Sequence, residues 1–312
     1  MTQSTKAFNI VALLNALLTL ALIVLGGIVH NTGSSLACPD WPLCFGQVMP
    51  KMEGGVAIEH SHRLLATLVG LLTILLVGLS ARTKTSNPRL FKWSVIALLA
   101  VIAQGVLGGI TVILKISPLV STFHLALSQI YFALTLYLFI ESRPGGYPSL
   151  EKSPRPSEKV FRILSLATVL LYLQILIGAA VRHTGAGAAC GLGLQYSVLC
   201  MEAESGGLTF WPSQIQSQFH IFHRYFGIVM VFIIAAATVP LMKWARLNGV
   251  ASVRKIAAAS HGIVLLQVVL GIVTVATHIG PHGVTAHLLF AALLWADLVT
   301  LNILMRRSQS AK

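Results

Sequence analysis

Long apolar segments, uncharged except for Asp297 in the last of them, dominate the chain. Eight such runs, each near the ~20 residues with which a helix crosses a bilayer, are separated by shorter polar segments. Backbone groups inside lipid must be hydrogen-bonded within their own segment, so each run predicts a transmembrane helix. The runs are Ala7–Val29, Leu64–Ala81, Trp93–Leu114, Ile116–Ile140, Ile163–Val181, Tyr225–Met242, Ile256–Thr277 and Gly283–Met305. The pattern predicts an all-α integral membrane protein with eight transmembrane helices.

Composition agrees with this pattern. Of the 312 residues, 55% are hydrophobic and 10% charged, whereas about 25% of residues are charged in a soluble domain. A soluble enzyme is therefore excluded. The first run is interpreted as a helix and not as a cleaved signal, because no small-residue cleavage site follows it. Lys6 is the only early cation and no Arg-rich presequence is present, which favours a bacterial plasma membrane over a mitochondrial one.

The net charge of +13 resembles a nucleic-acid footprint until it is sorted by loop. With the N-terminus in the cytoplasm, the inner segments hold seventeen Lys and Arg and three Glu, and the outer segments hold five cations and five acids. This is the positive-inside distribution of a membrane protein. Both termini are therefore predicted to be cytoplasmic, with the lipid bilayer as a partner and no nucleic acid.

All four cysteines fall in predicted outer loops, Cys38 and Cys44 in one and Cys190 and Cys200 in another. An extracytoplasmic compartment permits disulfides. Four cysteines allow three pairings, of which two loop-local bridges are the simplest. A zinc site is the weaker alternative, because neither pair has the short spacing of zinc ligands.

The chain repeats itself. The segments that recur, at offsets of 152 to 163 residues, are Gly33–Cys38 and Gly185–Cys190, His62-Arg63 and His223-Arg224, the stretches beginning at Gln104 and Gln267, and His124 and His287. Each copy has four spans, an even number, so both copies face the same way, as parallel repeats do. The prediction is two four-helix bundles, residues 1–141 and 161–312. A cytoplasmic linker, residues 142–160 with Pro144, Pro148, Pro154 and Pro156, joins them.

Of the eleven histidines, the repeat selects two pairs, His62 with His124 and His223 with His287. Each pair lies on two different helices near the outer end of one bundle. Two imidazoles facing each other inside a four-helix bundle are suited to hold a haem iron from both sides. A single membrane histidine more often makes an interhelical hydrogen bond, but two duplicated pairs favour axial ligands.

Small residues accompany these histidines. Gly105, Gly108 and Gly109 lie in the third span and Gly271 in the seventh. They allow a flat cofactor to approach the backbone closely, although ordinary close packing of helices explains them equally well.

The two copies differ beside the first histidine of each pair. Glu59 precedes His62 by three residues and shares its helix face, whereas the same position in the second copy is His220. A carboxylate there can accept a proton or stabilise developing charge, and its alternative role is to cap the helix N-terminus. Arg63 and Arg224, which follow the histidines, are predicted to pair with haem propionates or to reach lipid headgroups.

With these features the chain resembles the haem A synthases, membrane enzymes that convert haem O to haem A, over nearly its whole length. The most specific segments are Gly33-Ser-Ser-Leu-Ala-Cys-Pro-Asp-Trp-Pro-Leu-Cys44, Glu59-x-x-His62-Arg63, and His183-Thr184-Gly185 with Cys190. The Cys190–Cys200 segment departs from the family pattern because it is longer and lacks Trp-Pro.

The resemblance implies hydroxylation of the C8 methyl of haem O twice, followed by loss of water to leave a formyl group. The N-terminal half, through His62 and His124, would hold this substrate, with Glu59 essential. The C-terminal half, through His223 and His287, would hold a haem b that relays electrons. Cys38 and Cys44 would form a disulfide involved in haem handling or redox exchange.

The implied partners are a haem O synthase that delivers the substrate and an unidentified electron donor; a homo-oligomer is compatible with the sequence. Two other functions remain open. A dihaem b cytochrome linked to quinol would need equivalent halves and no Glu59, and a haem carrier would bind haem O unchanged. The roles of His60, His220 and the intramembrane Asp297 are not assigned by the sequence.

Overall fold

A computed structural model describes residues 3–143, 145–202 and 205–308. Pro144 of the predicted linker, and Glu204 and Lys312 of the charge distribution, lie outside the described residues. The described chain contains eight long helices that are apolar enough to cross a membrane. They are α1 (Gln3–Asn31), α2 (Gly54–Ala81), α3 (Pro88–Ile113), α4 (Pro118–Glu141), α6 (Glu158–His183), α7 (Ile215–Leu247), α8 (Ala251–Ala276) and α9 (Pro281–Met305). The prediction of an all-α protein with eight membrane helices is confirmed.

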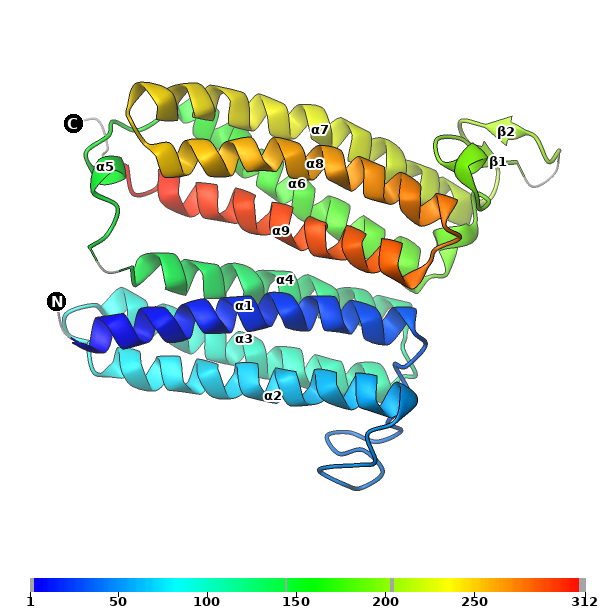
Figure 1. The fold of residues 1–312 in the computed structure, drawn as a ribbon, viewed down its shortest axis with the longest axis horizontal. Helices are drawn as coiled ribbons and strands as arrows, with labels where there is room; N and C mark the ends of the chain where they lie inside the picture. The colour runs from blue at the N-terminus through cyan, green and yellow to red at the C-terminus, as the bar shows by residue number, and fades with distance from the viewer. Residues whose placement is uncertain (1–2, 144, 203–204, 309–312) are drawn as a thin grey trace. The chain divides into compact units, whose positions relative to one another are not determined.

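The remaining elements are short. They are the helix α5 (Pro148–Glu151), the 3₁₀ turns η1 (Ala186–Ala188) and η2 (Leu194–Tyr196), and the strands β1 (Cys200–Met201) and β2 (Leu208–Thr209). The two strands pair antiparallel in the loop between α6 and α7 (Figure 1). The predicted linker therefore contains one turn of helix, α5.

The chain forms two compact units, Met1–Gly146 and Tyr147–Lys312, here called the N-terminal and C-terminal units. In the N-terminal unit each long helix packs against the next and α4 returns to α1, and in the C-terminal unit α9 returns to α6 in the same way (Figure 1). Each unit is thus a ring of four helices. In each ring the second and fourth helices lie diagonally across the bundle axis, so side chains directed inward from them can meet.

Two helices begin ten residues earlier than hydropathy predicts, α2 at Gly54 and not at Leu64, and α7 at Ile215 and not at Tyr225. The uncharged runs end at Arg63 and Arg224, but the helices continue through these arginines. Arg63 and Arg224 are accommodated within these helices because their side chains bind the backbone of the neighbouring loops. Both histidines that were placed at helix ends therefore lie two turns inside a helix.

The interior of each unit combines apolar packing with a few buried hydrogen bonds. In the N-terminal unit, Asn15 of α1 donates to Thr73 of α2 and Tyr131 of α4 at 3.1 and 3.2 Å. In the C-terminal unit, Ser260 of α8 donates to Asp297 of α9 at 3.4 Å. Asp297 therefore makes the interhelical hydrogen bond expected of a membrane acid.

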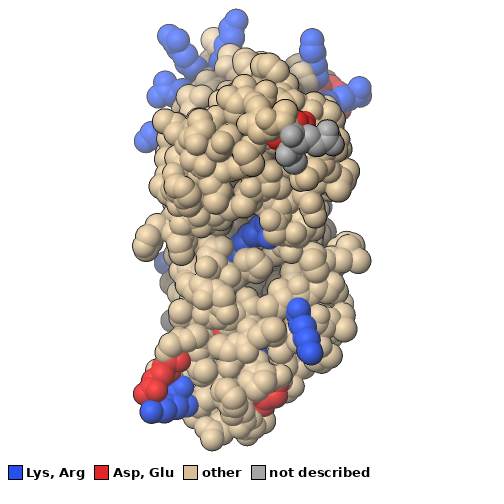
Figure 2. All heavy atoms as spheres, turned by 90° about the vertical axis from the view of Figure 1, so that its right-hand side faces the viewer, with Lys and Arg blue, Asp and Glu red and all other residues tan. Residues whose placement is uncertain are grey.

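Outside the two interiors, many leucine, isoleucine and phenylalanine side chains are exposed, for example Phe232 with 71% of its surface accessible. Such a surface is compatible with lipid and not with bulk water. Figure 2 looks along the helices of each unit, onto the loop between α1 and α2 in the N-terminal unit and the loop with β1 and β2 in the C-terminal unit, where Lys, Arg, Asp and Glu side chains are scattered among uncharged residues. The protein is a multi-pass membrane protein.

Candidate functional site

The first candidate site lies in the N-terminal unit, where α2 carries His62 and α4 carries His124. The two imidazoles are close enough to interact electrostatically. Each lies over a glycine of a neighbouring helix: a Cβ added to Gly26 of α1 would be 3.1 Å from His62 Nε2, and one added to Gly108 of α3 would be 3.1 Å from His124 Cε1. These glycines leave room for the rings, which any side chain there would displace.

The C-terminal unit repeats this arrangement with His223 of α7 and His287 of α9. Their ring centroids are 6.5 Å apart and their planes nearly perpendicular, at 82°. A metal ion bound by both imidazoles, with metal–nitrogen bonds of about 2 Å, places the two centroids roughly 6 Å apart. A Cβ on Gly178 would be 2.7 Å from His223 Cε1, and one on Gly271 would be 3.6 Å from His287 Cε1.

One ring nitrogen in each of three of these histidines lacks a protein partner within the described part of the chain, although His124 Nε2 lies 3.3 Å from the Gln104 amide nitrogen. The Nδ1 atoms of His124, His223 and His287 are buried and have no hydrogen-bond partner among the described residues. A buried polar atom without a partner is costly and rare. A metal ion bound at Nδ1 would give this buried atom a partner, with the ring proton on Nε2. The donor set therefore fits a metal or haem bound by two imidazoles.

Glu59 and Arg63 hold the loop between α1 and α2. The Glu59 carboxylate, which is buried, accepts the backbone N–H of Cys38 at 2.8 Å and a guanidinium N–H of Arg63 at 2.5 Å. Arg63 also donates to the carbonyl oxygens of Cys38 at 3.2 Å, Asp40 at 2.6 Å, and Leu43. These bonds join the loop to α2 one turn from His62.

This geometry excludes one interpretation of Glu59. Because α2 begins at Gly54, Glu59 lies in the second turn and does not cap the helix. Its carboxylate lies on the helix face that carries His62, at the base of the loop. In the C-terminal unit the corresponding His220 is also buried, and its Nδ1 has no partner among the described residues.

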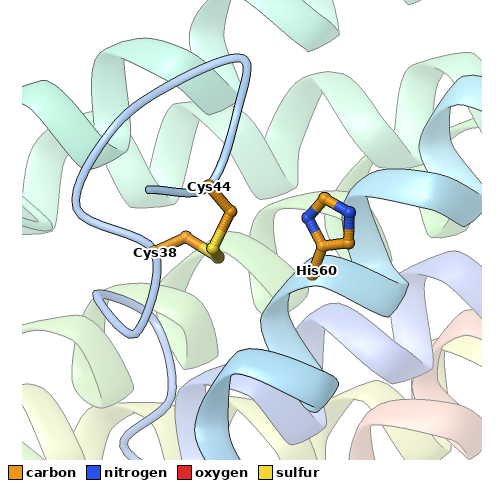
Figure 3. Close-up of side chains that lie close together, drawn as sticks. All are labelled: Cys38, Cys44 and His60. Atoms are coloured by element: carbon orange, nitrogen blue, oxygen red, sulfur yellow. A yellow bond between two sulfur atoms is a disulfide. The ribbon is translucent and has the colours of Figure 1, made fainter. Parts of the chain in front are cut away.

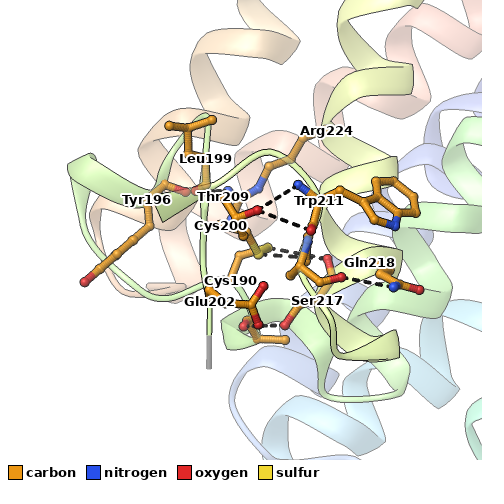
Figure 4. Close-up of a disulfide and its surroundings, with 12 residues drawn as sticks. Cys190, Tyr196, Leu199, Cys200, Glu202, Thr209, Trp211, Ser217, Gln218 and Arg224 are labelled. Carbon is orange, nitrogen blue, oxygen red and sulfur yellow. Dashed lines mark hydrogen bonds between the residues drawn. A yellow bond between two sulfur atoms is a disulfide. The ribbon is translucent and has the colours of Figure 1, made fainter. Parts of the chain in front are cut away.

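Arg224 repeats the role of Arg63 in the C-terminal unit. Its guanidinium donates to the carbonyl oxygens of Tyr196 and, at 3.5 Å, Leu199 (Figure 4). The loop is also fixed by Ser217, whose hydroxyl donates to the Ala189 carbonyl at 2.7 Å. Sequence analysis missed this loop-binding role of both arginines, while pairing with propionates stays a prediction.

Both loop-local disulfides are formed, Cys38–Cys44 and Cys190–Cys200. His60 lies beside the first, and a ring nitrogen of His60 and the two sulfurs lie within 4.8 Å of one another (Figure 3). The sulfurs are bonded to each other and so are not thiolates, the form in which cysteine binds zinc. His60 Nε2 lies 2.9 Å from the Val48 carbonyl oxygen, so this histidine is a third contact between α2 and the loop.

The loop reaches α3 as well. The Trp41 ring lies on the backbone of Gly109, where an added Cβ would be 2.6 Å from the indole. Within the loop, the Asp40 carboxylate accepts the N–H groups of Gly46 at 2.8 Å and Phe45 at 2.6 Å, and these bonds lower the pKa of Asp40. Gly109, adjacent to the glycine that receives His124, therefore receives the loop and not a cofactor.

A comparison with protein families decides the relationship of the chain. The model of the cytochrome oxidase assembly protein family (COX15-CtaA) matches residues 9–57 and 52–299. The chain belongs to this family. The matched residues include all four paired histidines, both arginines, Glu59 and the four cysteines.

Individual members of the family give the same result. A heme A synthase of Geobacillus thermodenitrificans is 28% identical over 93% of this chain and 89% of its own length, and one of Bacillus pumilus is 27% identical over 96% of each. A heme A synthase of Shouchella clausii is 33% identical, over 59% of this chain and 62%, less than two thirds, of its own length. These relatives are bacterial, and together with the eight helices they confirm a bacterial multi-pass membrane protein.

Proposed function

We propose that this protein is a haem A synthase that oxidises the C8 methyl of haem O to a formyl group. The observation that carries the proposal is a pair of histidines on the second and fourth helices of each bundle, with the His223 and His287 rings 6.5 Å apart, in a chain similar to proteins named heme A synthase. One bundle is suited to bind the substrate porphyrin and the other to bind a resident one. Two successive hydroxylations, each a two-electron oxidation of the methyl carbon by an external oxidant, would give a geminal diol, and loss of one water would leave the formyl.

The N-terminal unit is the proposed catalytic half. His62 and His124 would hold the iron of haem O between α2 and α4. Glu59 lies on the His62 face of α2 and is linked through Arg63 to the outer loop. Its carboxylate would accept a proton as the methyl is oxidised. Arg63 orients that carboxylate, and on arrival of the substrate the one donor that its bonds to the described residues leave, Nε–H, would pair with a propionate.

The C-terminal unit is the proposed cofactor half. His223 and His287 would hold a haem b, which when bound supplies one-electron redox chemistry. This unit has His220 in place of the carboxylate. Its imidazoles would fix the cofactor, and Arg224 would fix the loop that covers that end of the bundle.

Co-expression with a supply of haem O, in a host that lacks haem A, tests the proposal. The extracted pigments should contain haem A or hydroxylated haem O. Recovery of haem O alone would indicate a carrier, and recovery of haem b alone would indicate an electron-transfer cytochrome. His261→Ala is the matched control, because this histidine of α8 lies 3.2 Å from the Thr238 hydroxyl, away from both pairs, and its loss should leave the pigments unchanged.

A further inference from the structure

Each of the four paired histidines contacts the helix before its own in the same way. A glycine of that helix receives the imidazole, and the residue four positions before the glycine lies on the same helix face. The pairs are Leu22 and Gly26 for His62, Gln104 and Gly108 for His124, Gln174 and Gly178 for His223, and Gln267 and Gly271 for His287.

We call each of these residue pairs, with the histidine that it accompanies, a seat. In three of the four seats the first residue is a glutamine that binds the histidine backbone. The bonds from glutamine Nε2 to the histidine carbonyl oxygen are Gln104 to His124 at 3.0 Å, Gln174 to His223 at 2.8 Å and Gln267 to His287 at 2.9 Å. A helix carbonyl has a second lone pair for such a bond. Each glutamine therefore fixes the backbone of a paired histidine against the helix that also holds its ring.

The His62 seat is the exception. Leu22 stands where the other seats have glutamine, and it packs against the apolar core of the N-terminal unit. A second difference accompanies it. Gly227 of α7 makes room for Gln174, since an added Cβ would be 3.1 Å from the amide nitrogen. At the repeat offset of 161 residues, the N-terminal unit has Ala66 in place of that glycine.

The consequence is a difference in restraint between the two units. Among the described residues, both histidines of the C-terminal pair accept a side-chain hydrogen bond from the neighbouring helix, but in the N-terminal pair only His124 does. A ligand held in place before binding loses less entropy on binding and is released more slowly. A hydrogen bond of this kind is expected to slow haem release by a factor of about 3 to 10.

We propose that Gln174 is a positioning residue that makes the C-terminal pair a permanent haem site, and that Leu22 leaves His62 as the releasable ligand through which the N-terminal unit exchanges haem. The inference rests on the proposed function and deepens it: a cofactor must stay, whereas a substrate must enter and its product must leave. The glutamines act through the histidines and not on the porphyrin.

Haem release from each unit separately provides the test. The full-length protein carrying His124→Ala leaves only the C-terminal site, and the protein carrying His287→Ala leaves only the N-terminal site. Transfer of haem to excess apomyoglobin is followed by absorbance. In the first background, Gln174→Leu should speed haem loss about 3- to 10-fold and weaken the low-spin bis-imidazole spectrum. Gln216→Leu, which changes an exposed glutamine of α7, the helix that carries His223, should change neither.

The reverse exchange covers the case in which Gln174→Leu fails to fold. In the second background, Leu22→Gln combined with Ala66→Gly should slow haem loss from the N-terminal site by a similar factor. Unchanged release in both exchanges would overturn the inference even if haem A is still formed. Absence of bound haem from both units would overturn the proposed function with it. If the haem-release rates change as predicted but no haem A is formed, the inference is supported and only the proposed conversion of haem O to haem A is refuted.

Discussion

The two units have the same helix order and the same diagonal pair of histidines, but they fix the surroundings of these histidines differently. In the N-terminal unit the loop is bound by a charged cluster, Glu59 and Arg63, and its histidine pair has one glutamine. In the C-terminal unit the loop is bound by Arg224 and Ser217, His220 stands at the position of Glu59, and both histidines have a glutamine. The N-terminal unit therefore has a carboxylate beside its loop, and the C-terminal unit has one more glutamine bound to its paired histidines.

The duplicated sequence distinguishes positions that are the same in both units from positions that differ. Positions that stay the same in both units, such as the four glycines beneath the imidazoles, are those that we assign to haem binding under the proposed function. Positions that differ, Glu59 against His220 and Leu22 against Gln174, are those where the proposed reaction and proposed storage make different demands. Each of the following substitutions changes one of the two units and leaves the other intact.

Removal of one histidine from each pair should have the largest effect. His124→Ala should reduce haem A to the background of the host while haem b remains bound, because only the substrate site loses a ligand. His287→Ala should remove haem b. Pyridine haemochrome spectra and chromatography of extracted pigments measure both, and loss of the same pigment in both variants would contradict the division of roles.

Glu59→Gln should reduce product formation by about 10²- to 10⁴-fold, the usual contribution of a positioned proton acceptor, while the haem b spectrum persists. The amide keeps an acceptor for the Cys38 N–H, so the loop contact is partly preserved. His220→Gln changes the same position of the other unit and should retain turnover. Normal turnover of Glu59→Gln would reduce this residue to a loop anchor.

Gly109→Ala tests the seating of the loop on α3. The new methyl would meet the Trp41 ring at 2.6 Å, and such overpacking costs about 1–3 kcal/mol, so the loop should be cleaved faster by protease. Gly105→Ala is the matched control on the same helix, with no atom within 4 Å of the new methyl. Equal proteolysis of the two variants would show that the indole does not depend on this glycine.

The smallest effect is expected from Asp40. Its carboxylate accepts two loop N–H groups that lower its pKa below the ordinary value of 3.8. A group whose pKa is lowered by folding stabilises the fold above its unfolded pKa and loses that contribution as the pH falls through the folded one. Proteolysis of the loop should therefore be constant from pH 8 to about pH 5 and increase only in stronger acid. Asp40→Asn should abolish the acid dependence, and an increase near neutral pH would contradict this assignment.

Much of this architecture is predictable from sequence because membrane helices and duplicated histidines leave strong patterns. Hydropathy located all eight spans, and the repeat selected His62, His124, His223 and His287 from eleven histidines. The early starts of α2 and α7 were missed because hydropathy treats a charged residue as the end of a helix. It does not register that Arg63 satisfies loop carbonyls.

The glutamine seats were missed for another reason. Gln104 and Gln267 were noticed only as part of a repeated segment, and Gln174 was not noticed, because contact with a backbone carbonyl needs no particular partner side chain. A search for glutamine followed four residues later by glycine, on the helix preceding each histidine, would have found all three. The same search would have identified Leu22 as the exception.

The most direct test of the central claim is which porphyrin each unit retains. Protein co-expressed with a haem O supply should be purified as His223→Ala, which leaves the N-terminal site, and as His124→Ala, which leaves the C-terminal site. The account predicts haem O or its oxidised products in the first variant and haem b alone in the second. The same porphyrin in both variants would contradict it.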